Sequence, residues 1–336
     1  MPFASYTCPV KLRLGAVTLL VAICCVVSAC GSTSSSSVPK RVGTANVAYA
    51  GSLQLVMEKY IGPAFSQAEG FSYQGRGGGS LGLAQEVISG EITPNVFISV
   101  GSGPLSTLEP KYTTWAVRVA SSPLVVAYYP QGTYSAELDR IREGKLPLRD
   151  LFTLLAKPGF RLGRTDPATD PQGQAFAMMI SLAARLYDLP ASVPTADLGG
   201  ADPGGEVYPE TSLEAQLQAG QLDAASSFKS EAIQLKLPYI TLPSAINFGD
   251  PADLSQYQAA TLQLTTGKTV HGFLLDIEAT VLGHDQQAAA DSFVTYLASS
   301  AGRALLAREG YATPPAVITG RATGAPEALR KIASGG

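Results

Sequence analysis

Gly75-Arg76-Gly77-Gly78-Gly79-Ser80-Leu81-Gly82 is the stretch from which the architecture of this chain can be inferred. It follows an extended run at residues 71–74 and precedes apolar residues at helical spacing up to Ile88. Glycines between a strand and a helix let a ligand approach the backbone, and the first N–H groups of the helix have no partner within it. Because the helix dipole favours negative charge at this end, the stretch predicts an anion-binding site that includes Gly79 and Ser80.

Two further units of the same kind lie nearby. Residues 46–50 form a strand-like run, Gly51-Ser52 the turn, and residues 53–61 carry the apolar stripe of a helix. Residues 95–100 indicate a third strand, which the turn Gly101-Ser102-Gly103-Pro104 follows. Successive strand, turn and helix units are typical of α/β proteins with a mostly parallel sheet, whose ligands bind at the carboxyl ends of the strands. The first two turns are therefore expected to converge on one ligand.

Length and composition restrict the class of protein. The chain of 336 residues is too long for one small core, so two lobes are expected. With 46% hydrophobic and 15% charged residues, the chain is globular rather than disordered. Its net charge of −3 gives no basic face, so nucleic-acid binding is not expected.

The N-terminus has the pattern of a signal peptide. Lys11 and Arg13 precede an apolar run at residues 14–27, which is short for a membrane span. The run ends in Val27-Ser28-Ala29-Cys30-Gly31, which resembles the bacterial lipobox and implies cleavage before Cys30 and lipidation of its sulfur. The alternative is cleavage near Ala29 with Cys30 unmodified. All four cysteines lie at or before position 30, so the mature body would hold no disulfide.

Five segments follow from this organisation. We expect a lipoprotein signal peptide at residues 1–29, and the lipidated cysteine with a Ser-rich tether at 30–42. The first lobe would take residues 43–123 and 243–336, and the second lobe residues 124–242. Removal of the signal peptide takes away two basic residues and no acidic one, so the net charge of −3 becomes −5. Further helices are expected at 148–155, 172–187, 213–219, 286–299 and 302–309, and further strands at 115–121, 124–129, 160–164, 222–228, 239–242 and 257–264.

Thr266-Gly267-Lys268-Thr269 is similar to the end of a P-loop. That motif requires a glycine at position 262, where this chain has Leu262, and strand-like runs flank the four residues on both sides. The stretch therefore predicts a hairpin turn, and no ATPase site is expected in this chain.

Four motifs in the same order resemble the tungstate/molybdate-binding proteins of ABC importers. They are Ala50-Gly51-Ser52-Leu53, the stretch 163–173, Asn247-Phe248-Gly249-Asp250-Pro251 and the stretch 267–272, and the similarity covers about residues 45–315. The resemblance implies an α/β, two-lobe type II periplasmic-binding-protein fold, in which each lobe is a mixed, mostly parallel sheet flanked by helices. It also implies capture of an oxyanion in an interlobe cleft, without bond chemistry or a cofactor. The partners would be an ABC permease and its ATPase subunit, and the protein would be a monomer outside the cytoplasm, anchored to a bacterial membrane through Cys30.

The resemblance also implies individual ligand-binding residues. Ser52 and Ser80, with Gly51 and Gly79 before them, match the serines of the family's two helix starts, and Asp170 matches the acid before Pro-x-Gly. Family members often carry a Phe-Glu-Tyr run whose glutamate contacts the metal of the oxyanion. This chain has Ser226-Ser227-Phe228 there, so that carboxylate is missing and the two serines are further candidate donors.

The chemistry of the ligand defines what each candidate can do. Molybdate, tungstate and sulfate only accept hydrogen bonds near neutral pH, so the hydroxyls of Ser52 and Ser80 are suitable donors. The alternative is that these serines cap their helices. A carboxylate repels a dianion unless it contacts the metal centre or is protonated, so Asp170 either contacts Mo or W directly or caps the helix that begins with Pro171.

Other charged residues are weaker candidates. Arg76 and Arg164 could pair with the anion, but solvation or pairing with nearby acids is the more common role of arginine. His271 is expected in the hairpin, and His284 in a loop before a helix. Monohydrogen phosphate could donate its proton to Asp170, so a phosphate receptor is an alternative, as is a sulfate receptor.

A serine esterase is the alternative from another class. Residues 78–82 fit G-x-S-x-G, and Asp250 or Asp253 followed by His271 would complete the order Ser, Asp, His. The sequence lacks an HGGG-type oxyanion loop, and a hydrolase would leave the twin turn at Gly51-Ser52 without a role. A binding protein is therefore favoured over an enzyme.

Overall fold

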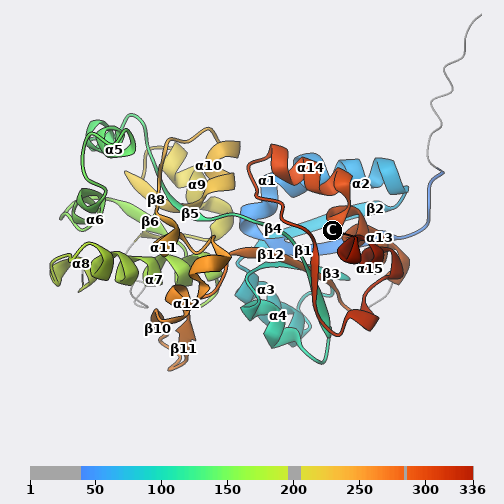
Figure 1. The fold of residues 1–336 in the computed structure, drawn as a ribbon. Helices are drawn as coiled ribbons and strands as arrows, with labels where there is room; N and C mark the ends of the chain where they lie inside the picture. Colours follow the sequence, from blue (N-terminus) through green and yellow to red (C-terminus); the bar gives the residue numbers. More distant parts are fainter. Residues whose placement is uncertain (1–38, 196–205, 284–285, 336) are drawn as a thin grey trace, which may run out of the picture. The chain divides into compact units, whose positions relative to one another are not determined.

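The computed structural model describes residues 39–195, 206–283 and 286–335. Two larger β-sheets with helices on their faces, together with a separate two-stranded hairpin, make up this part of the chain (Figure 1). The predicted signal peptide, the tether and Cys30 lie outside the described residues, apart from 39–42 of the tether.

The first sheet has six strands in the order β13-β4-β12-β3-β1-β2. β1 pairs in parallel with β2 and β3, whereas β12 is antiparallel to β3 and β4, and β13 is antiparallel to β4. The strands are β1 (Thr44–Ala50), β2 (Ser72–Gly78), β3 (Val96–Val100), β4 (Trp115–Ser121), β12 (Asp276–Val281) and β13 (Val317–Gly320).

The second sheet has five strands in the order β7-β6-β8-β5-β9. β6 is parallel to β7 and β8, and β5 is antiparallel to β8 and β9. Its strands are β5 (Leu124–Tyr128), β6 (Leu162–Arg164), β7 (Glu206–Val207), β8 (Ala224–Phe228) and β9 (Tyr239–Thr241). Both sheets are mixed, as expected, but the antiparallel strands β12 and β5 in their middles make them less parallel than the sequence predicted.

Helices cover both faces of the first sheet because its strands alternate side chains between the faces. Ala48 and Phe97 pack against α3 (Ser80–Ser89) and α4 (Gly103–Leu108), while Val47 and Ile98 face the opposite helices. Those opposite helices are α2 (Gly62–Glu69), α13 (Gln287–Ala298) and α14 (Ser300–Arg308), with α15 (Glu327–Ser334) packed on α13.

The second sheet is covered in the same way. Val125 and Ala225 pack against α9 (Glu210–Gln218) and α10 (Lys229–Gln234). Val126 and Phe228 face the long buried helix α7 (Pro171–Leu186). The remaining helices of this lobe are α5 (Ser135–Arg142), α6 (Arg149–Leu155) and α8 (Ser192–Thr195).

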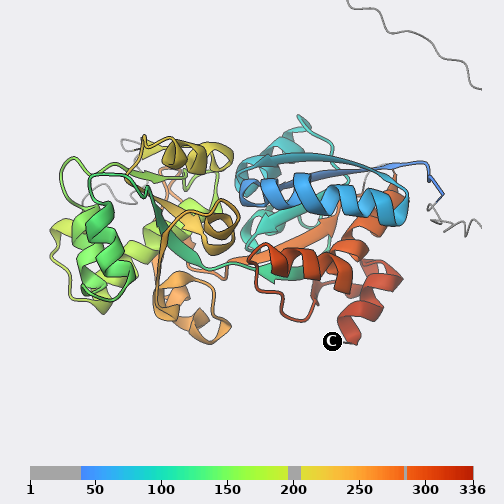
Figure 2. The ribbon, with the colours of Figure 1, turned by 90° about the horizontal axis from the view of Figure 1, so that it is seen from above.

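Two segments carry the chain between the sheets. β4 continues into β5 through Ser122, whose N–H donates to the carbonyl of Leu275 (3.3 Å), just before β12. The green and orange segments therefore run side by side in Figure 2. α11 (Ser244–Asn247) and β10 (Thr261–Gln263) contact α7 of the second lobe, with α12 (Leu254–Gln258) beside α11. The lobe boundaries stay a prediction. Because α11 and β10 contact α7, the chain is expected to return to the first lobe later than residue 242.

Two local predictions have clear outcomes. β10 and β11 (Thr269–His271) form the expected hairpin, with Gly267 at a φ of +83° in its turn. The glycine-rich stretch is mostly strand rather than loop, because Gly75 to Gly78 pair with β1. A Cβ at Gly75 would overlap the ends of the Glu58 and Tyr73 side chains, so these two side chains would have to shift.

Candidate functional site

The first Gly/Ser turn starts a helix directly after β1. Gly51–Leu53 form a 3₁₀ turn that continues through α1 (Gln54–Val56) and a π-helical segment, Met57–Ile61, into α2. Ser52 is 4% exposed, and its Oγ has no hydrogen-bond partner. Tyr311 Oη donates to the carbonyl oxygen of Ser52 (3.1 Å), so the backbone at this turn is held while the hydroxyl is left unpaired.

The second Gly/Ser turn lies beside the first, because Ala50 pairs with Gly78 in the parallel β1–β2 ladder. Ser80 is fully buried, and its Oγ accepts a hydrogen bond from Val100 N (3.3 Å). The N–H groups of Leu81 and Gly82 both donate to the carbonyl of Thr169 (3.1 Å each). The helix start that the sequence assigned to an anion therefore binds a backbone carbonyl of the second lobe.

Neither serine caps its helix. Ala50 and Gly79 occupy the N-cap positions, without a side-chain hydrogen bond at either. The capping alternative for Ser52 and Ser80 is therefore wrong. The two hydroxyls differ instead in their surroundings, since one has no partner and the other is bonded inside the sheet.

Asp170 fits both interpretations that the sequence left open. It is the N-cap of α7, and its Oδ1 accepts a hydrogen bond from Gln172 N (2.9 Å). Its Oδ2 is buried without a partner. Burial raises the pKa of Asp170 to about 6, with a smaller rise from Asp166, against the lowering effects of Gln172 N–H and the Thr165 hydroxyl. One oxygen thus holds the helix, and the other is left for a ligand or a proton.

Gly79 permits the second lobe to approach this closely. A Cβ at Gly79 would lie 2.6 Å from the carbonyl oxygen of Thr169 and 3.4 Å from the Cβ of Asp170. Because the first of these atoms is backbone, no side-chain rotation would relieve the overlap. Glycine is therefore required where α3 meets the loop that carries Asp170.

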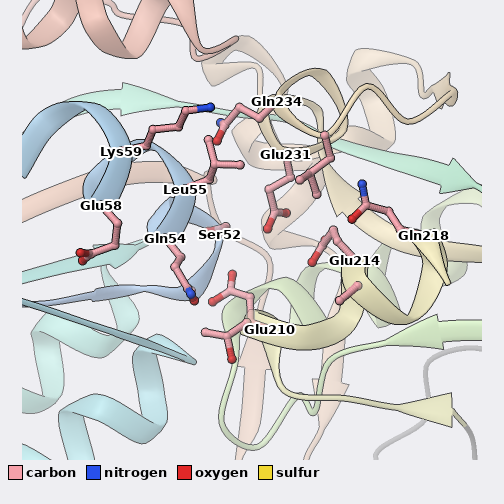
Figure 3. Close-up of a pocket in the computed structure, with 14 residues that line it drawn as sticks. Ser52, Gln54, Leu55, Glu58, Lys59, Glu210, Glu214, Gln218, Glu231 and Gln234 are labelled. Atoms are coloured by element: carbon pink, nitrogen blue, oxygen red, sulfur yellow. The ribbon is translucent and has the colours of Figure 1, made fainter. Parts of the chain in front are cut away.

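Three buried glutamates that the sequence did not single out surround a cavity next to Ser52. Glu210 and Glu214 lie on α9, and Glu231 lies on α10. Figure 3 shows their carboxyl groups pointing toward one space beside Ser52 and Gln54. The cavity has a volume of about 400 Å³, and its charged lining residues are Glu58, Lys59, Glu210, Glu214 and Glu231.

Glu210 lies at the junction of the two Gly/Ser turns. Both of its carboxyl oxygens are buried without a hydrogen-bond partner, and a Cβ at Gly51 would lie 2.9 Å from its Oε2. Burial raises the pKa of Glu210 well above its usual range, and the charge of Asp170 raises it further. The Ser52 hydroxyl and the Gly51 N–H lower it because they lie near the carboxyl group, although neither forms a hydrogen bond of normal distance and angle with it. Glu210 also lines a second cavity of about 290 Å³ together with Gly79 and Asp170.

Glu214 and Glu231 are held by the second sheet. Ser227 Oγ donates to Glu214 Oε1 (3.3 Å), and Glu231 Oε2 accepts from Phe228 N (3.1 Å) and Gln172 Nε2 (3.4 Å). Burial raises the pKa of Glu214 to about 7, against the lowering effect of its hydrogen bond with Glu231. Burial, then the charge of Glu214, raises the pKa of Glu231 well above its usual range.

Ser226 and Ser227 lie behind the cavity rather than in its lining. Both are fully buried in β8, and Ser226 Oγ donates to Gln172 Oε1 (2.8 Å). Ser227 instead orients Glu214. The structure therefore does not bring these hydroxyls to the surface of either cavity, and it uses them to position groups that are closer to it.

The remaining candidates lie away from Ser52. Arg76 forms a surface ion pair with Glu86 (2.6 Å), as the alternative predicted. Arg164 is buried in β6 with 2% exposure, so it is not a solvated arginine. His271 lies in the hairpin, with Nδ1 3.3 Å from the carbonyl oxygen of Gln258, and His284 lies outside the described residues.

Comparison with known proteins identifies the family. The model of the family described as bacterial extracellular solute-binding protein matches residues 45–312. The chain belongs to this family. A relative from Haloferax volcanii, named as an ABC transporter molybdenum-binding protein, is 33% identical over 259 residues, which cover 77% of this chain and 78% of the relative. A molybdate/tungstate-binding protein from Pyrococcus abyssi is 26% identical over 228 residues, which cover 61% of this chain and 64% of that protein.

Solved structures agree on the fold. The periplasmic molybdate-binding protein of Azotobacter vinelandii superimposes with a TM-score of 0.57 at 15% identity, over 81% of this solute-binding protein and 100% of that chain. A sulfate-binding protein from Mycobacterium tuberculosis gives 0.52 at 11% identity, over 87% and 91%. The type II periplasmic-binding-protein fold is therefore confirmed, and so is the resemblance drawn from the sequence motifs.

Membership of this family establishes a solute receptor of an ABC transporter that works outside the cytoplasm. The esterase alternative is wrong, because the family consists of receptors and the hydroxyl of Ser80 is fully buried.

In the part of the chain that the structure describes, no helix is long and apolar enough to cross a membrane. No group of three or more His, Cys, Asp or Glu side chains in that same part is arranged to hold a metal ion.

The sequence contains a signal for two of the three buried glutamates. Glu210 and Glu214 are four residues apart, so on a helix they occupy the same face. Like charges at that spacing are unfavourable on a helix, which makes the pair unusual if it only faces solvent. Glu231 has no such signal, because its burial depends on how α10 packs on the sheet.

Proposed function

We propose that this receptor captures molybdate or tungstate in the cleft between its lobes and delivers it to a membrane permease with its ATPase subunit. The Haloferax and Pyrococcus relatives, named for binding these metals, support this choice of solute. The oxyanion would lie at the cavity that Ser52 and Gly51 border on one side and Glu210 borders on the other.

The unpaired hydroxyl of Ser52 is the observation that carries this proposal. A buried hydroxyl without a partner is costly, and an oxyanion that accepts its hydrogen bond removes that cost. The adjoining helix start adds backbone N–H groups and a favourable dipole. Asp170 would contribute from the adjacent turn, where its Oδ2 also lacks a partner and Gly79 lines the same small cavity, whereas Ser80 is bonded inside the sheet.

Cleft closure would couple binding to recognition by the permease. Leu81 and Gly82 donate to Thr169, and Glu210 lies against Gly51, so each helix start of the first lobe contacts the second lobe. A solute that bridges these contacts stabilises the closed arrangement. We further propose that the receptor acts as a monomer anchored through lipidated Cys30, and that direct contact of Asp170 with the metal centre of the solute assists capture.

Monohydrogen phosphate is the second candidate solute. Asp170 and Glu210 both present carboxyl oxygens without partners, and a phosphate that retains a proton can donate to such an oxygen. Tungstate and molybdate lack that proton. Discrimination between these anions would therefore depend on whether the two carboxyl groups are ionised.

A thermal-shift panel followed by competition calorimetry tests the proposal. Tungstate and molybdate are expected to raise the unfolding midpoint and to compete with each other, because a ligand of the folded state stabilises it in proportion to its affinity. Sulfate and phosphate are the comparison anions. Stabilisation by phosphate alone would contradict the proposed solute, and the absence of any shift would contradict oxyanion capture.

A further inference from the structure

The cavity beside Ser52 has an acidic wall. Glu210, Glu214 and Glu231 are all at least nine-tenths buried, and their carboxyl groups share this space with the unpaired Oγ of Ser52 (Figure 3). Among the described residues that line the cavity, Lys59 is the one cation, and it is exposed with its Nζ 5.3 Å from the ring centroid of Tyr60. This described lining therefore contains no buried positive charge that could balance these acids.

The two closest acids constrain each other. Glu214 on α9 lies within hydrogen-bonding reach of Glu231 on α10. Two carboxyl groups that share one buried site are not both ionised, because like charges at short range in a low dielectric repel strongly. The pair therefore retains a proton and behaves as a unit rather than as two separate acids.

An oxyanion beside this wall makes ionised carboxylates still less favourable. A protonated carboxyl group, by contrast, has an O–H that donates to an oxyanion, which adds to the hydroxyl of Ser52. The acids and the solute therefore fit the same cavity only when protons are present. The need for protons follows from the positions of the side chains and from the fact that the solute cannot donate a hydrogen bond.

We propose that the receptor takes up protons when it binds its oxyanion, and that the Glu214–Glu231 pair with Glu210 holds them. The inference rests on the proposed function, since it concerns the same cavity and the same solute. It makes solute affinity dependent on pH, with capture favoured at lower pH outside the cell. It also gives the acidic wall a role in selecting anions that lack a proton of their own.

Other charged or titratable groups approach the Glu214–Glu231 pair from the neighbouring elements. Asp170 and Asp166 precede α7, Glu58 and Lys59 lie on the helix after Ser52, and Tyr311 approaches from the loop after α14. Asp170 and Asp166 add negative charge, and Glu58 accepts hydrogen bonds from Tyr49 (2.7 Å) and Tyr73 (2.9 Å). The negative charge of Asp170 raises the pKa of Glu231 and so favours proton uptake, whereas the positive charge of exposed Lys59 opposes it.

Calorimetric titration of the full chain with tungstate tests this inference. Titrations at pH 7.5 in two buffers with different ionisation enthalpies report the number of protons taken up. Titrations between pH 6.5 and 8.5 report how the affinity for tungstate depends on pH. We expect uptake of about one proton per tungstate and an affinity that falls about tenfold per pH unit, as linkage of one proton requires.

Variants that replace a glutamate by neutral glutamine show which side chain takes up the proton. Glu214→Gln retains an N–H donor without a charge, so we expect lower proton uptake and tighter binding than the wild type at pH 8.5. Glu231→Gln tests the same pair if the first variant does not fold, and exposed Glu91→Gln is the matched control that should retain wild-type linkage. Tungstate binding without proton uptake, or unchanged uptake in both variants, would overturn this inference alone. Failure of the wild type to bind any oxyanion would overturn the proposed function as well.

Discussion

The helix starts at Gly51-Ser52 and Gly79-Ser80 are alike in sequence and lie side by side, yet they make different contacts. The first has an unpaired hydroxyl that faces a cavity lined with acids. The second has a serine bonded to Val100 inside the sheet and N–H groups bonded to Thr169 of the other lobe. A repeated turn can thus leave a hydroxyl without a partner in one copy and form backbone hydrogen bonds to another segment in the other.

The difference arises from the group that each turn meets on the segments packed against it. Gly51 meets the side chain of Glu210, which can move or change its protonation state. Gly79 meets the backbone of Thr169, which has no titratable group and moves only with the segment that carries it. The first turn is therefore the more adaptable of the two.

Ser52→Ala should have the largest effect on binding. Loss of a hydrogen bond to a charged partner weakens affinity by about 1.5 to 3 kcal/mol, whereas folding stability should hardly change because the hydroxyl has no protein partner. Calorimetry with tungstate and thermal unfolding measure the two quantities. Exposed Ser102→Ala in the third turn is the control. Wild-type affinity in Ser52→Ala would remove this serine from the site.

Gly79→Ala should disturb the contact between the lobes. Its Cβ would overlap the Thr169 carbonyl at 2.6 Å, and overpacking of this kind costs about 1 to 3 kcal/mol. Gly82→Ala is a matched control on the same helix, because its Cβ would lie 3.7 Å from the nearest atom, which is ordinary contact. Unfolding midpoints and tungstate affinities of the two variants can be compared directly. Equal behaviour would argue against a fixed contact at Gly79.

The fold was largely predictable because it depends on local patterns. The run of β1, turn and helix, the strand β4 and the helix α7 all have apolar periodicity that the sequence displays. The central strand β12 was not expected, since its acidic residues Asp276 and Glu278 obscure a buried strand. Their burial depends on neighbouring strands that the local sequence does not specify.

The site was predictable only in part. Ser52 was predicted because it belongs to a recognisable turn, and Asp170 because its stretch resembles the family's motif before Pro-x-Gly. The acids of α9 and α10 approach Ser52 from the other lobe, so their role depends on tertiary packing. Local sequence also does not distinguish Ser80, whose hydroxyl turns into the sheet, from Ser52, whose hydroxyl does not.

Ser80→Ala should lower folding stability more than tungstate affinity, which is the opposite of what we expect for Ser52→Ala. The substitution leaves the buried N–H of Val100 without its acceptor, which should lower folding stability by about 1 to 2 kcal/mol. Affinity for tungstate should fall less than in Ser52→Ala. Chemical denaturation together with calorimetry provides both values. A stable Ser80→Ala protein with a large loss of affinity would instead return Ser80 to the ligand site.

Asp170→Asn should raise folding stability by an amount that depends on pH. The pKa of Asp170 is raised to about 6, so the stability associated with its protonated form is present below about pH 4 and lost as pH rises through 6. Asparagine caps a helix as well as aspartate does. The variant should therefore be more stable than the wild type at pH 8, by up to about 3 kcal/mol, and about equal to it at pH 4. Thermal unfolding at both values would show this, and destabilisation at pH 8 would contradict it.

The position of bound tungstate tests the central distinction between the two helix starts most directly. Anomalous scattering from tungsten in crystals grown with the solute locates the metal without ambiguity. We expect one site in the cavity bordered by Ser52 and Glu210, with an oxygen of the anion within hydrogen-bonding distance of Ser52 Oγ. A tungsten site that contacts Ser80 but not Ser52, or a site outside this cavity, would contradict the account.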